Sequence, residues 1–225
     1  MGKFKMKNFK NLIFREFIIT FKNTKSLYSY CTFFFTSILL FVFAIGPDIS
    51  ILSQIYKPIL WMITIFSLIL ISETFVFEDF LDGSLSELQF LGYSEEIIFL
   101  SKCSVMFVSL IIPNVILIPV SSILFKVDLA SVIEITTLFI ISLPTITLIS
   151  ILSALFSLQV KRNKFIQFIL IMPFFIPIII FATAENFFVA NFSNEFKILV
   201  LIGLFLITLP LSILIGKLII KELNY

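Results

Sequence analysis

The chain has 225 residues, of which 60% are hydrophobic and only 13% are charged, with a formal net charge of +2. Its mean hydropathy is +1.15. Soluble domains average about 45–50% apolar and about 25% charged residues, so this composition excludes a water-soluble globular protein. The sequence contains no histidine, and its two cysteines, Cys31 and Cys103, are too far apart to form a C-x-x-C motif. We therefore expect inert thiols, no zinc or redox site and no catalytic residue.

The sequence also lacks a phosphate-binding loop of the G-x-x-x-x-G-K-[ST] type. Any ATP that drives the protein is therefore expected to be bound and hydrolysed by a separate partner subunit. The sequence shows no motif for a directly bound cofactor, metal or nucleic acid. These absences favour a membrane protein that is not itself an enzyme.

The N-terminal segment predicts an amphipathic helix over residues 8–25 that lies in the membrane interface. Phe9, Ile13, Phe17 and Phe21 recur every four residues, which places them on one side of a helix. This side is flanked by Leu12, Phe14 and Ile18. The opposite side carries Asn8, Asn11, Arg15 and Lys22. The alternative is a basic flank that only orients the first membrane span.

Six apolar windows are long enough to cross a bilayer, which needs about 20 residues per helix. The expected spans are residues 27–45, 58–77, 97–125, 132–160, 165–184 and 198–217. We therefore expect a single all-α membrane domain over residues 1–225. Pro113, Pro119 and Pro144 mark expected kinks in the two long spans.

The basic residues are distributed unequally between the two sides of these spans. Twelve lie on the side of both termini: Lys3, Lys5, Lys7, Lys10, Arg15, Lys22, Lys25, Lys161, Arg162, Lys164, Lys217 and Lys221. Only Lys57, Lys126 and Lys197 lie on the other side. The positive-inside rule then predicts a multi-pass protein of the bacterial or mitochondrial inner membrane, with both termini inside.

The loop between the second and third spans, residues 78–96, is acidic although it is expected inside. No basic residue occurs between Lys57 and Lys102, and half of the 14 carboxylates fall there: Glu73, Glu78, Asp79, Asp82, Glu87, Glu95 and Glu96. Carboxylates contribute little to topology, so the acidic loop does not change the expected orientation.

The sequence of this loop predicts a short helix. Asp82 and Gly83 can form a turn, and Ser84 with Glu87 has the spacing of a capping box. Leu81, Leu85 and Leu88 would then form an apolar edge, with Phe80 and Leu91 nearby. Such a helix could dock in a groove of a soluble protein. A solvated turn whose leucines touch lipid headgroups is an equally good interpretation.

Several polar residues and prolines in the spans carry their own expectations. Glu73, at the inner end of the second span, is assigned a structural or coupling role, with snorkelling to the surface as the alternative. We expect Lys102, Glu134 and Glu185 to be solvated near span ends. Asn114 is expected to satisfy backbone groups freed at the Pro113 kink. Pro173 and Pro177 are expected to break or kink the fifth span.

Several of these segments resemble the haem exporter protein B family, CcmB. The resembling residues are 45–48 (IGPD), 59–61 (ILW), Glu73, Glu78 and Asp79, 82–88 (DGSLSEL), 143–145 (LPT), Lys161 with Arg162, and 172–184 (MPFFIPIIIFATA). The acidic loop and the fifth-span segment are the specific parts. This sequence departs from the family at Thr74 and Phe77, where basic residues are usual, and at residues 91–94, where a proline-bearing stretch is usual.

The resemblance implies a fold similar to that of type-2 ABC exporters. That fold has an amphipathic N-terminal helix, six spans, a coupling helix between the second and third spans, and a re-entrant hairpin between the fifth and sixth. The candidate for the hairpin is residues 185–195, with Phe187, Phe188 and Phe192.

The resemblance further implies that the protein is the permease subunit of an ABC complex for cytochrome c-type biogenesis. A CcmA-like ATPase would dock on the coupling segment, and CcmC-, CcmD- and CcmE-like proteins would complete the machinery that delivers haem at the outer face. A homodimer within the complex is expected. The candidate docking and coupling residues are Glu73, Glu78, Asp79, Asp82, Gly83, Ser84, Leu85, Glu87 and Leu88.

Other functions remain open at this stage. A type-2 ABC permease for another hydrophobic substrate would share the same features, and so would a non-transporting scaffold for haem-handling partners. An ion-coupled carrier is disfavoured, because such carriers place ionisable residues near the bilayer midplane, whereas here they fall near span ends.

Overall fold

The computed structural model describes residues 2–22, 24–160, 164–183 and 193–223, and in these ranges the regular secondary structure is entirely α-helical. The helices are α1 (Gly2–Lys22), α2 (Lys25–Ile45), α3 (Ile49–Leu81), α4 (Ser84–Phe90), α5 (Glu95–Phe125), α6 (Leu129–Gln159), α7 (Lys164–Thr183) and α8 (Asn194–Glu222). The segment expected to be an interfacial helix, residues 8–25, falls mainly within α1.

Six of the described helices are long and apolar enough to cross a membrane: α2, α3, α5, α6, α7 and α8. Each expected span lies inside one of these helices or differs from its ends by a single residue. The largest difference is in α3, which begins at Ile49 because Asp48 caps it there and the helix continues through Pro58. The all-α integral membrane fold with six transmembrane helices is confirmed.

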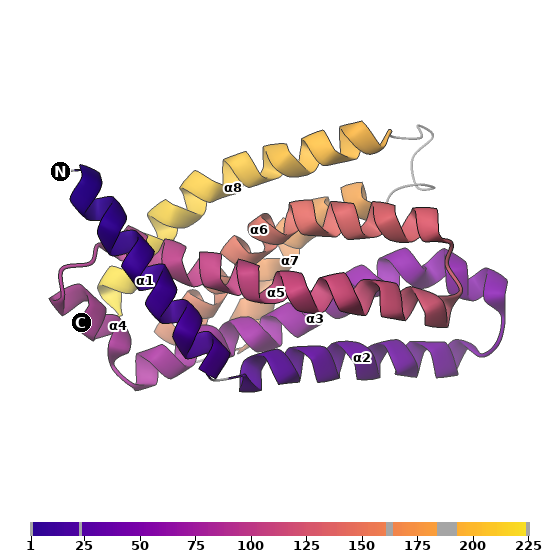
Figure 1. Ribbon diagram of the computed structural model, residues 1–225, viewed down its shortest axis with the longest axis horizontal. Helices are drawn as coiled ribbons and strands as arrows, with labels where there is room; N and C mark the ends of the chain where they lie inside the picture. Colours follow the sequence, from indigo (N-terminus) through magenta and orange to yellow (C-terminus); the bar gives the residue numbers. More distant parts are fainter. Residues whose placement is uncertain (1, 23, 161–163, 184–192, 224–225) are drawn as a thin grey trace.

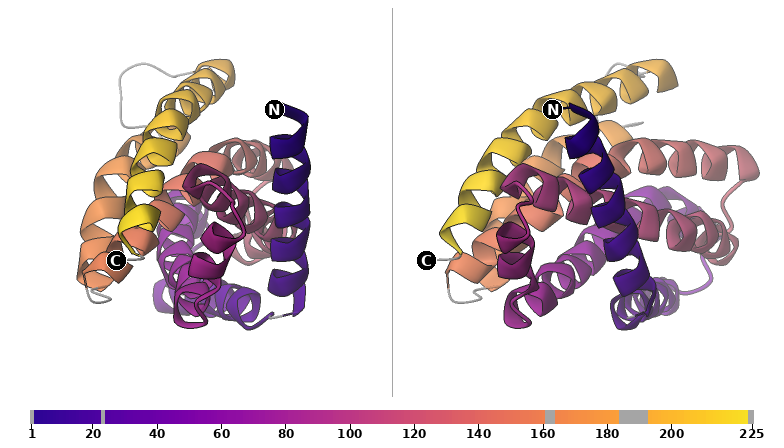
Figure 2. Two further views of the ribbon diagram at one scale, coloured as in Figure 1. Left: turned by 90° about the vertical axis from the view of Figure 1, so that its left-hand side faces the viewer. Right: turned by 60° about the vertical axis from the view of Figure 1, so that its left-hand side comes forward.

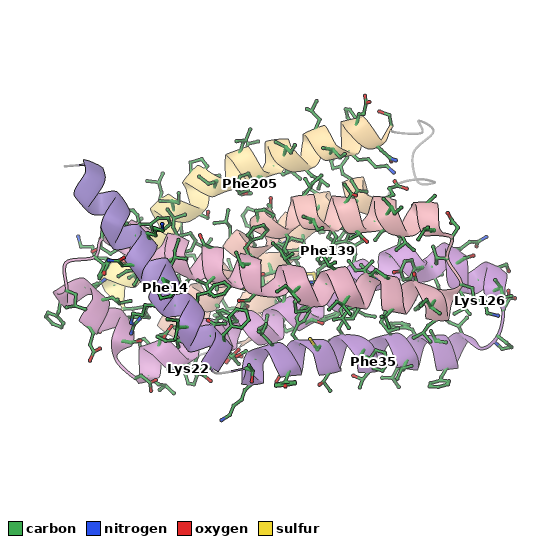
Figure 3. All side chains as sticks on the ribbon, viewed as in Figure 1. Phe14, Lys22, Phe35, Lys126, Phe139 and Phe205 are labelled. Atoms are coloured by element: carbon green, nitrogen blue, oxygen red, sulfur yellow. The ribbon has the colours of Figure 1, made fainter. Side chains whose placement is uncertain are left out.

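The long helices run side by side along the molecule, with α3 and α6 at the centre (Figure 1). Of the six spans, α6 and α3 are the most buried, and α8 and α2 are the least buried. Phe139 of α6 lies inside the bundle against Trp61 of α3, with ring centroids 5.3 Å apart. Phe35 of α2 points away from the bundle (Figure 3).

Small hydroxyl side chains explain why α3 and α6 can pack at the centre. The buried ones are Thr64, Ser67 and Ser72 on α3, and Ser142, Thr145, Thr147, Ser150, Ser153 and Ser157 on α6. Small residues allow helix backbones to approach closely in an apolar medium. Several of these hydroxyls donate back to their own helix, as Ser67 does to the Ile63 carbonyl at 2.7 Å.

Three buried polar side chains join neighbouring spans. The Tyr30 hydroxyl of α2 donates to Asn114 Oδ1 of α5 at 2.7 Å. The Tyr56 hydroxyl of α3 donates to the Ile118 carbonyl of α5 at 2.8 Å. Gln167 of α7 donates through its side-chain amide to Ser72 Oγ of α3 at 2.8 Å. Each contact removes a polar group from lipid and ties one helix to the next.

The expectation for Asn114 is met in part. Its amide donates to the Leu110 carbonyl at 2.8 Å, so it does bond backbone beside the Pro113 kink. Its oxygen, however, accepts from Tyr30 across the helix interface. Asn114 therefore also holds α2 against α5.

The two ends of the bundle differ. One end, here called the α4 end, carries α1, α4 and both chain termini (Figures 1 and 2). The opposite end carries the turns before α3 and α6, where Lys126 lies (Figure 3). At these turns Asp48 accepts from the Ser50 N–H at 3.0 Å, and Asp128 accepts from the Ser131 N–H at 3.1 Å. Each carboxylate thus caps a helix N-terminus.

Glu134 lies near the opposite end, but it is not a freely solvated residue as expected. Its carboxylate pairs with Lys197 of α8 at 2.9 Å and with Lys57 of α3 at 3.4 Å. The Lys197 side chain is almost fully buried in this contact. A buried charge is stable only when it is paired, so these three residues hold α8 to α6 and α3.

The expected break in the fifth span is not observed. Helix α7 runs without interruption from Lys164 to Thr183 and includes both Pro173 and Pro177. Neighbouring helices can accommodate the backbone groups that prolines free in a membrane span. The expected hairpin residues Glu185, Phe187, Phe188 and Phe192 lie outside the described residues, and α8 already begins at Asn194.

Candidate coupling site around α4

Helix α4 lies at the tip of the bundle, beyond the end of α3 (Figure 1). Asp82 and Gly83 form the turn that separates it from α3. Gly83 has φ +71°, a left-handed conformation that side-chain-bearing residues rarely adopt, so glycine allows the chain to turn here without strain. Gly92 has φ +84° and ends α4 before α5 begins.

The expected capping box at Ser84 is wrong. The N-cap position is Gly83, which has no side chain, and Ser84 is already the first residue of α4. The Ser84 hydroxyl instead donates back to the carboxylate of Asp79 at 3.1 Å and to the Asp79 carbonyl at 3.3 Å. It therefore joins α4 to the last turn of α3.

Two of the three leucines of the expected apolar edge are turned inward, and the third, Leu81, is exposed. Leu85 and Leu88 are buried in the hydrophobic core of the protein. Gln89 follows them and donates through its side-chain amide to the Ile220 carbonyl of α8 at 3.4 Å. These residues anchor α4 to its own bundle.

The exposed face of α4 and its turns combines apolar and acidic side chains. Phe90 is 91% exposed, Leu91 is 74% exposed and Leu81 is 65% exposed. Asp82 and Glu87 are exposed beside them. We call Leu81, Asp82, Glu87, Phe90 and Leu91 the α4 surface. The exposure of Phe90 was not predicted from the sequence, because Phe90 does not share the helical spacing of Leu81, Leu85 and Leu88.

Asp79 also belongs to a second feature, a buried ion cluster centred on Lys102. Lys102 of α5 donates to the carboxylates of both Asp79 of α3 and Glu16 of α1. Its side chain is 6% exposed, and the side chain of Glu16 is 3% exposed. We call these three residues the Lys102 cluster. Lys102 is therefore a buried, paired cation and not the solvated residue expected from its place near the span end.

Glu16 was also missed by sequence reasoning, although the sequence contains a signal for it. It is the only acidic residue before Asp48, in a segment rich in lysine. It follows Leu12 by one helical turn, and both side chains are buried where α1 packs on α5. Arg15, which is itself half-exposed, also pairs with Glu16 at 2.7 Å.

The other side of α1 faces outward. Phe14 is 68% exposed, and Ile18 and Phe21 are also exposed (Figure 3). The exposed lysines Lys10 and Lys22 lie on the same helix. An apolar face with flanking lysines suits the boundary between acyl chains and headgroups.

Glu73 lies further along α3, between the centre of the bundle and Asp79. It is buried, so it does not snorkel to the surface. Its neighbour Thr74 donates to the Ser26 hydroxyl of α2 at 2.9 Å. The structural or coupling role of Glu73 therefore stays a prediction, and the snorkelling alternative is wrong.

Comparison with known protein families covers the segments described above. The sequence model of the family described as "CcmB protein" matches residues 7–216, which is most of the chain. This chain belongs to the CcmB family. The matched residues include α4, the Lys102 cluster and all six spans except the last residues of α8.

Relatives with curated names agree with this membership. The chain is 26% identical over 176 residues to "Heme exporter protein B" of Haemophilus influenzae, covering 78% of this chain and 80% of that one. It is 28% identical over 173 residues to the protein of the same name from Escherichia coli K12, covering 76% and 79%. It is 25% identical over 154 residues to that of Bradyrhizobium diazoefficiens, covering 68% and 69%.

Two apolar cavities of about 260 Å³ each flank α8 in this CcmB-family chain. One lies between α8, α6 and α7, and its lining includes Phe156, Phe174 and Leu211. The other lies between α8, α5 and α6, and its lining includes Phe107 and Phe205. Neither cavity has a charged residue in its lining. Their largely apolar linings are suited to hydrocarbon.

No metal centre is formed by the part of the chain that the structure describes. There, no three His, Cys, Asp or Glu side chains lie together in a way that could hold a metal ion. Cys103 is buried and Cys31 is half-buried, and both are free thiols.

Proposed function

We propose that this CcmB-family chain is the membrane permease subunit of an ABC complex that serves haem handling in cytochrome c-type biogenesis. Two observations support the proposal: the six-span bundle of a family whose relatives are named heme exporter protein B, and the exposed α4 surface at one end of that bundle. The α4 surface carries the argument, because a permease without its own ATP site needs a place where an ATPase can dock.

The composition of the α4 surface supports docking of a soluble partner. An aromatic side chain that is almost fully exposed in the free protein is a frequent anchor of protein interfaces. Phe90 and Leu91 supply such an anchor, and Asp82 and Glu87 supply negative charge around it. Charge at the rim of an interface sets partner choice and association rate. We therefore assign this surface to a CcmA-like ATPase subunit.

The distribution of basic residues supports an orientation with the α4 end inside. Lys10, Arg15 and Lys22 lie on α1, and Lys217 and Lys221 lie near the end of α8, all at the end that carries α4. Positive charge is retained on the inner side of membranes. We therefore place the α4 end in the cytoplasm of a bacterium, or in the matrix if the source is mitochondrial, with the protein in the inner membrane.

The proposed partners follow from the family. CcmC-, CcmD- and CcmE-like proteins would act with this subunit, and a second copy of this chain would complete the permease. Since the sequence has no histidine, any direct contact with haem would use apolar side chains, Tyr, Met or Cys. A permease for another hydrophobic substrate and a scaffold for haem-handling partners remain the alternatives.

The docking proposal is tested by co-purification with the ATPase subunit in mild detergent. A Phe90→Ser, Asp82→Lys, Glu87→Lys variant should lose the ATPase while it stays inserted in the membrane. Asp79 is left unchanged in this variant because it pairs with Lys102. The matched control is Phe43→Ser. Phe43 is 78% exposed, but it lies near the C-terminal end of α2, away from the α4 end of the bundle. Retention of the ATPase by the triple variant would refute the docking surface.

The haem-related role is tested in cells. Deletion of the gene should abolish covalent haem on c-type cytochromes, and the wild-type gene should restore it. Normal c-type cytochromes in the deletion strain would contradict a role in cytochrome maturation and would favour a permease for another substrate.

A further inference from the structure

The Lys102 cluster joins three helices, α3, α5 and α1, through one shared cation. Asp79 sits in the last turn of α3, Lys102 in the second turn of α5, and Glu16 in the middle of α1. Lys102 lies between the two carboxylates and is buried with Glu16. Without these two carboxylates the buried Lys102 would have no counter-charge in the cluster, so the ion pairs hold the three helices together here.

Asp79 also has a direct connection to α4. It accepts from the Ser84 hydroxyl at 3.1 Å, and Ser84 is the first residue of α4. A displacement of α4 therefore acts on Asp79 through Ser84 and through the short turn at Asp82 and Gly83. Lys102 then passes the displacement to α5, and Glu16 passes it to α1.

Helix α1 is suited to receive such a displacement. Its buried face holds Glu16 and packs on α5, while Phe14 and Ile18 on its other face are exposed where the membrane interface is expected. A small cavity of about 40 Å³ lies beside the cluster, lined by Glu16, Ser26, Thr74 and Asp79 among others. The cavity has room for water beside the ion pairs.

We infer that Glu16, Asp79 and Lys102 are positioning residues that make α1 and α4 move as one unit when the ATPase acts on α4. The inference rests on the proposed function of the α4 surface. It adds that the interfacial helix is a moving part of the coupling machinery, and that Lys102 is the joint between the helix that meets the ATPase and the helix that meets the lipid.

The first test needs only the isolated protein in detergent. Spin labels on exposed Asn11→Cys of α1 and Glu87→Cys of α4, in a background with Cys31 and Cys103 replaced by serine, report the distance between these helices. The unmodified cluster should give one narrow distance distribution, and Lys102→Met should broaden it. If the distance distribution of Lys102→Met is as narrow as that of the intact cluster, the inference that Lys102 links α1 to α4 is wrong.

The second test separates a joint from a merely stabilising contact. Lys102→Met alone removes the cation shared by the two carboxylates and leaves Glu16 with Arg15 as its remaining ion-pair partner, whereas Glu16→Gln, Asp79→Asn, Lys102→Met removes all three charges of the cluster together. Replacing a whole buried ion group restores stability in known cases. The triple variant should therefore melt like the wild type and still bind the ATPase, yet lose at least ten-fold in covalent haem on c-type cytochromes. Recovery of this haem together with stability would overturn the inference.

The control for both tests is Lys217→Met. Lys217 pairs with Glu96 at 2.7 Å at the same end of the bundle, but this half-exposed pair joins α8 to α5 and reaches neither α1 nor α4. It should leave the distance distribution and the haem signal unchanged. If the wild-type protein binds no ATPase at all, the proposed function fails, and the distance measurement still decides whether Lys102 joins α1 to α4.

Discussion

Gly216 of α8 lies against the ring of Phe99 of α5, so closely that a Cβ atom at residue 216 would be 2.6 Å from Phe99 Cδ2. Phe99 is fully buried, which leaves its ring little room to move. The two helices therefore approach each other at a point where only a residue without a side chain fits. This contact brings α8 against the start of α5, close to the Lys102 cluster.

Substitution of Gly216 should consequently destabilise the protein. Gly216→Ala overpacks the contact with Phe99 and should lower the free energy of unfolding by about 1–3 kcal/mol. The measurement is thermal or denaturant unfolding in detergent. The matched control is Gly203→Ala on the same helix, where a Cβ would meet nothing within 4 Å. Equal effects of the two substitutions would contradict the close approach.

The hydrogen bond between Tyr30 and Asn114 makes a second prediction. Tyr30→Phe leaves the Asn114 oxygen buried without this donor, which should lower the stability by about 1–3 kcal/mol. Removing both polar groups with Tyr30→Phe, Asn114→Leu should recover part of this loss. A double-mutant cycle measures the coupling, and additive effects of the two substitutions would show that the bond is absent.

The inner and outer faces of α4 should respond differently to truncation. Leu85→Ala removes a buried side chain and should loosen α4, at about 2–5 kcal/mol, as judged by hydrogen exchange of the α4 amides. Phe90→Ala removes an exposed side chain and should leave hydrogen exchange unchanged while weakening ATPase binding about ten-fold or more. The opposite pattern would mean that Leu85 faces the partner.

The two aspartate caps at the opposite end predict how stability depends on pH. Hydrogen bonds from Ser50 hold the pKa of Asp48 below its usual value, and those from Ser131 do the same for the pKa of Asp128. A carboxylate with a lowered pKa in the folded state contributes stability that is present above its unfolded pKa, about 3.9, and is lost as the pH falls through its folded pKa.

Asp48→Asn, Asp128→Asn should therefore melt below the wild type at pH 7, and the two melting temperatures should converge as the pH falls below about 4. Asparagine remains a good cap, so the comparison isolates the charge of the two carboxylates. A difference in melting temperature that stays constant down to acid pH would contradict this role.

Local features of the sequence predicted the six spans and the place of α4 to within a few residues. Apolar length determines a membrane helix, and Gly83 and Gly92 act on the backbone where they stand. The orientation of α4 could not be predicted in this way. Whether Leu85 points inward depends on its contacts with the rest of the bundle, including the tie from Gln89 to Ile220, which is 131 residues away.

The Lys102 cluster shows the same limit. Glu16 and Lys102 are 86 residues apart, and no spacing in the sequence predicts that they meet. The position of Lys102 near a span end favoured solvation, but packing of α1 over α5 covers it. The lone acidic residue in a basic segment was a usable signal. A helix that only binds lipid headgroups through its lysines gains nothing from a carboxylate such as Glu16.

Two ion pairs, one near each end of α8, bracket the part of this helix that lies between Lys197 and Lys217. Lys197 pairs with Glu134 and Lys217 pairs with Glu96, and between them lie an apolar stretch and the two cavities. Twenty residues of helix span about 30 Å, which is the thickness of the hydrocarbon layer of a typical bilayer. Bilayer thickness and the two ion pairs therefore act on the same helix, and the choice of lipid belongs among the variables of any assay of this protein.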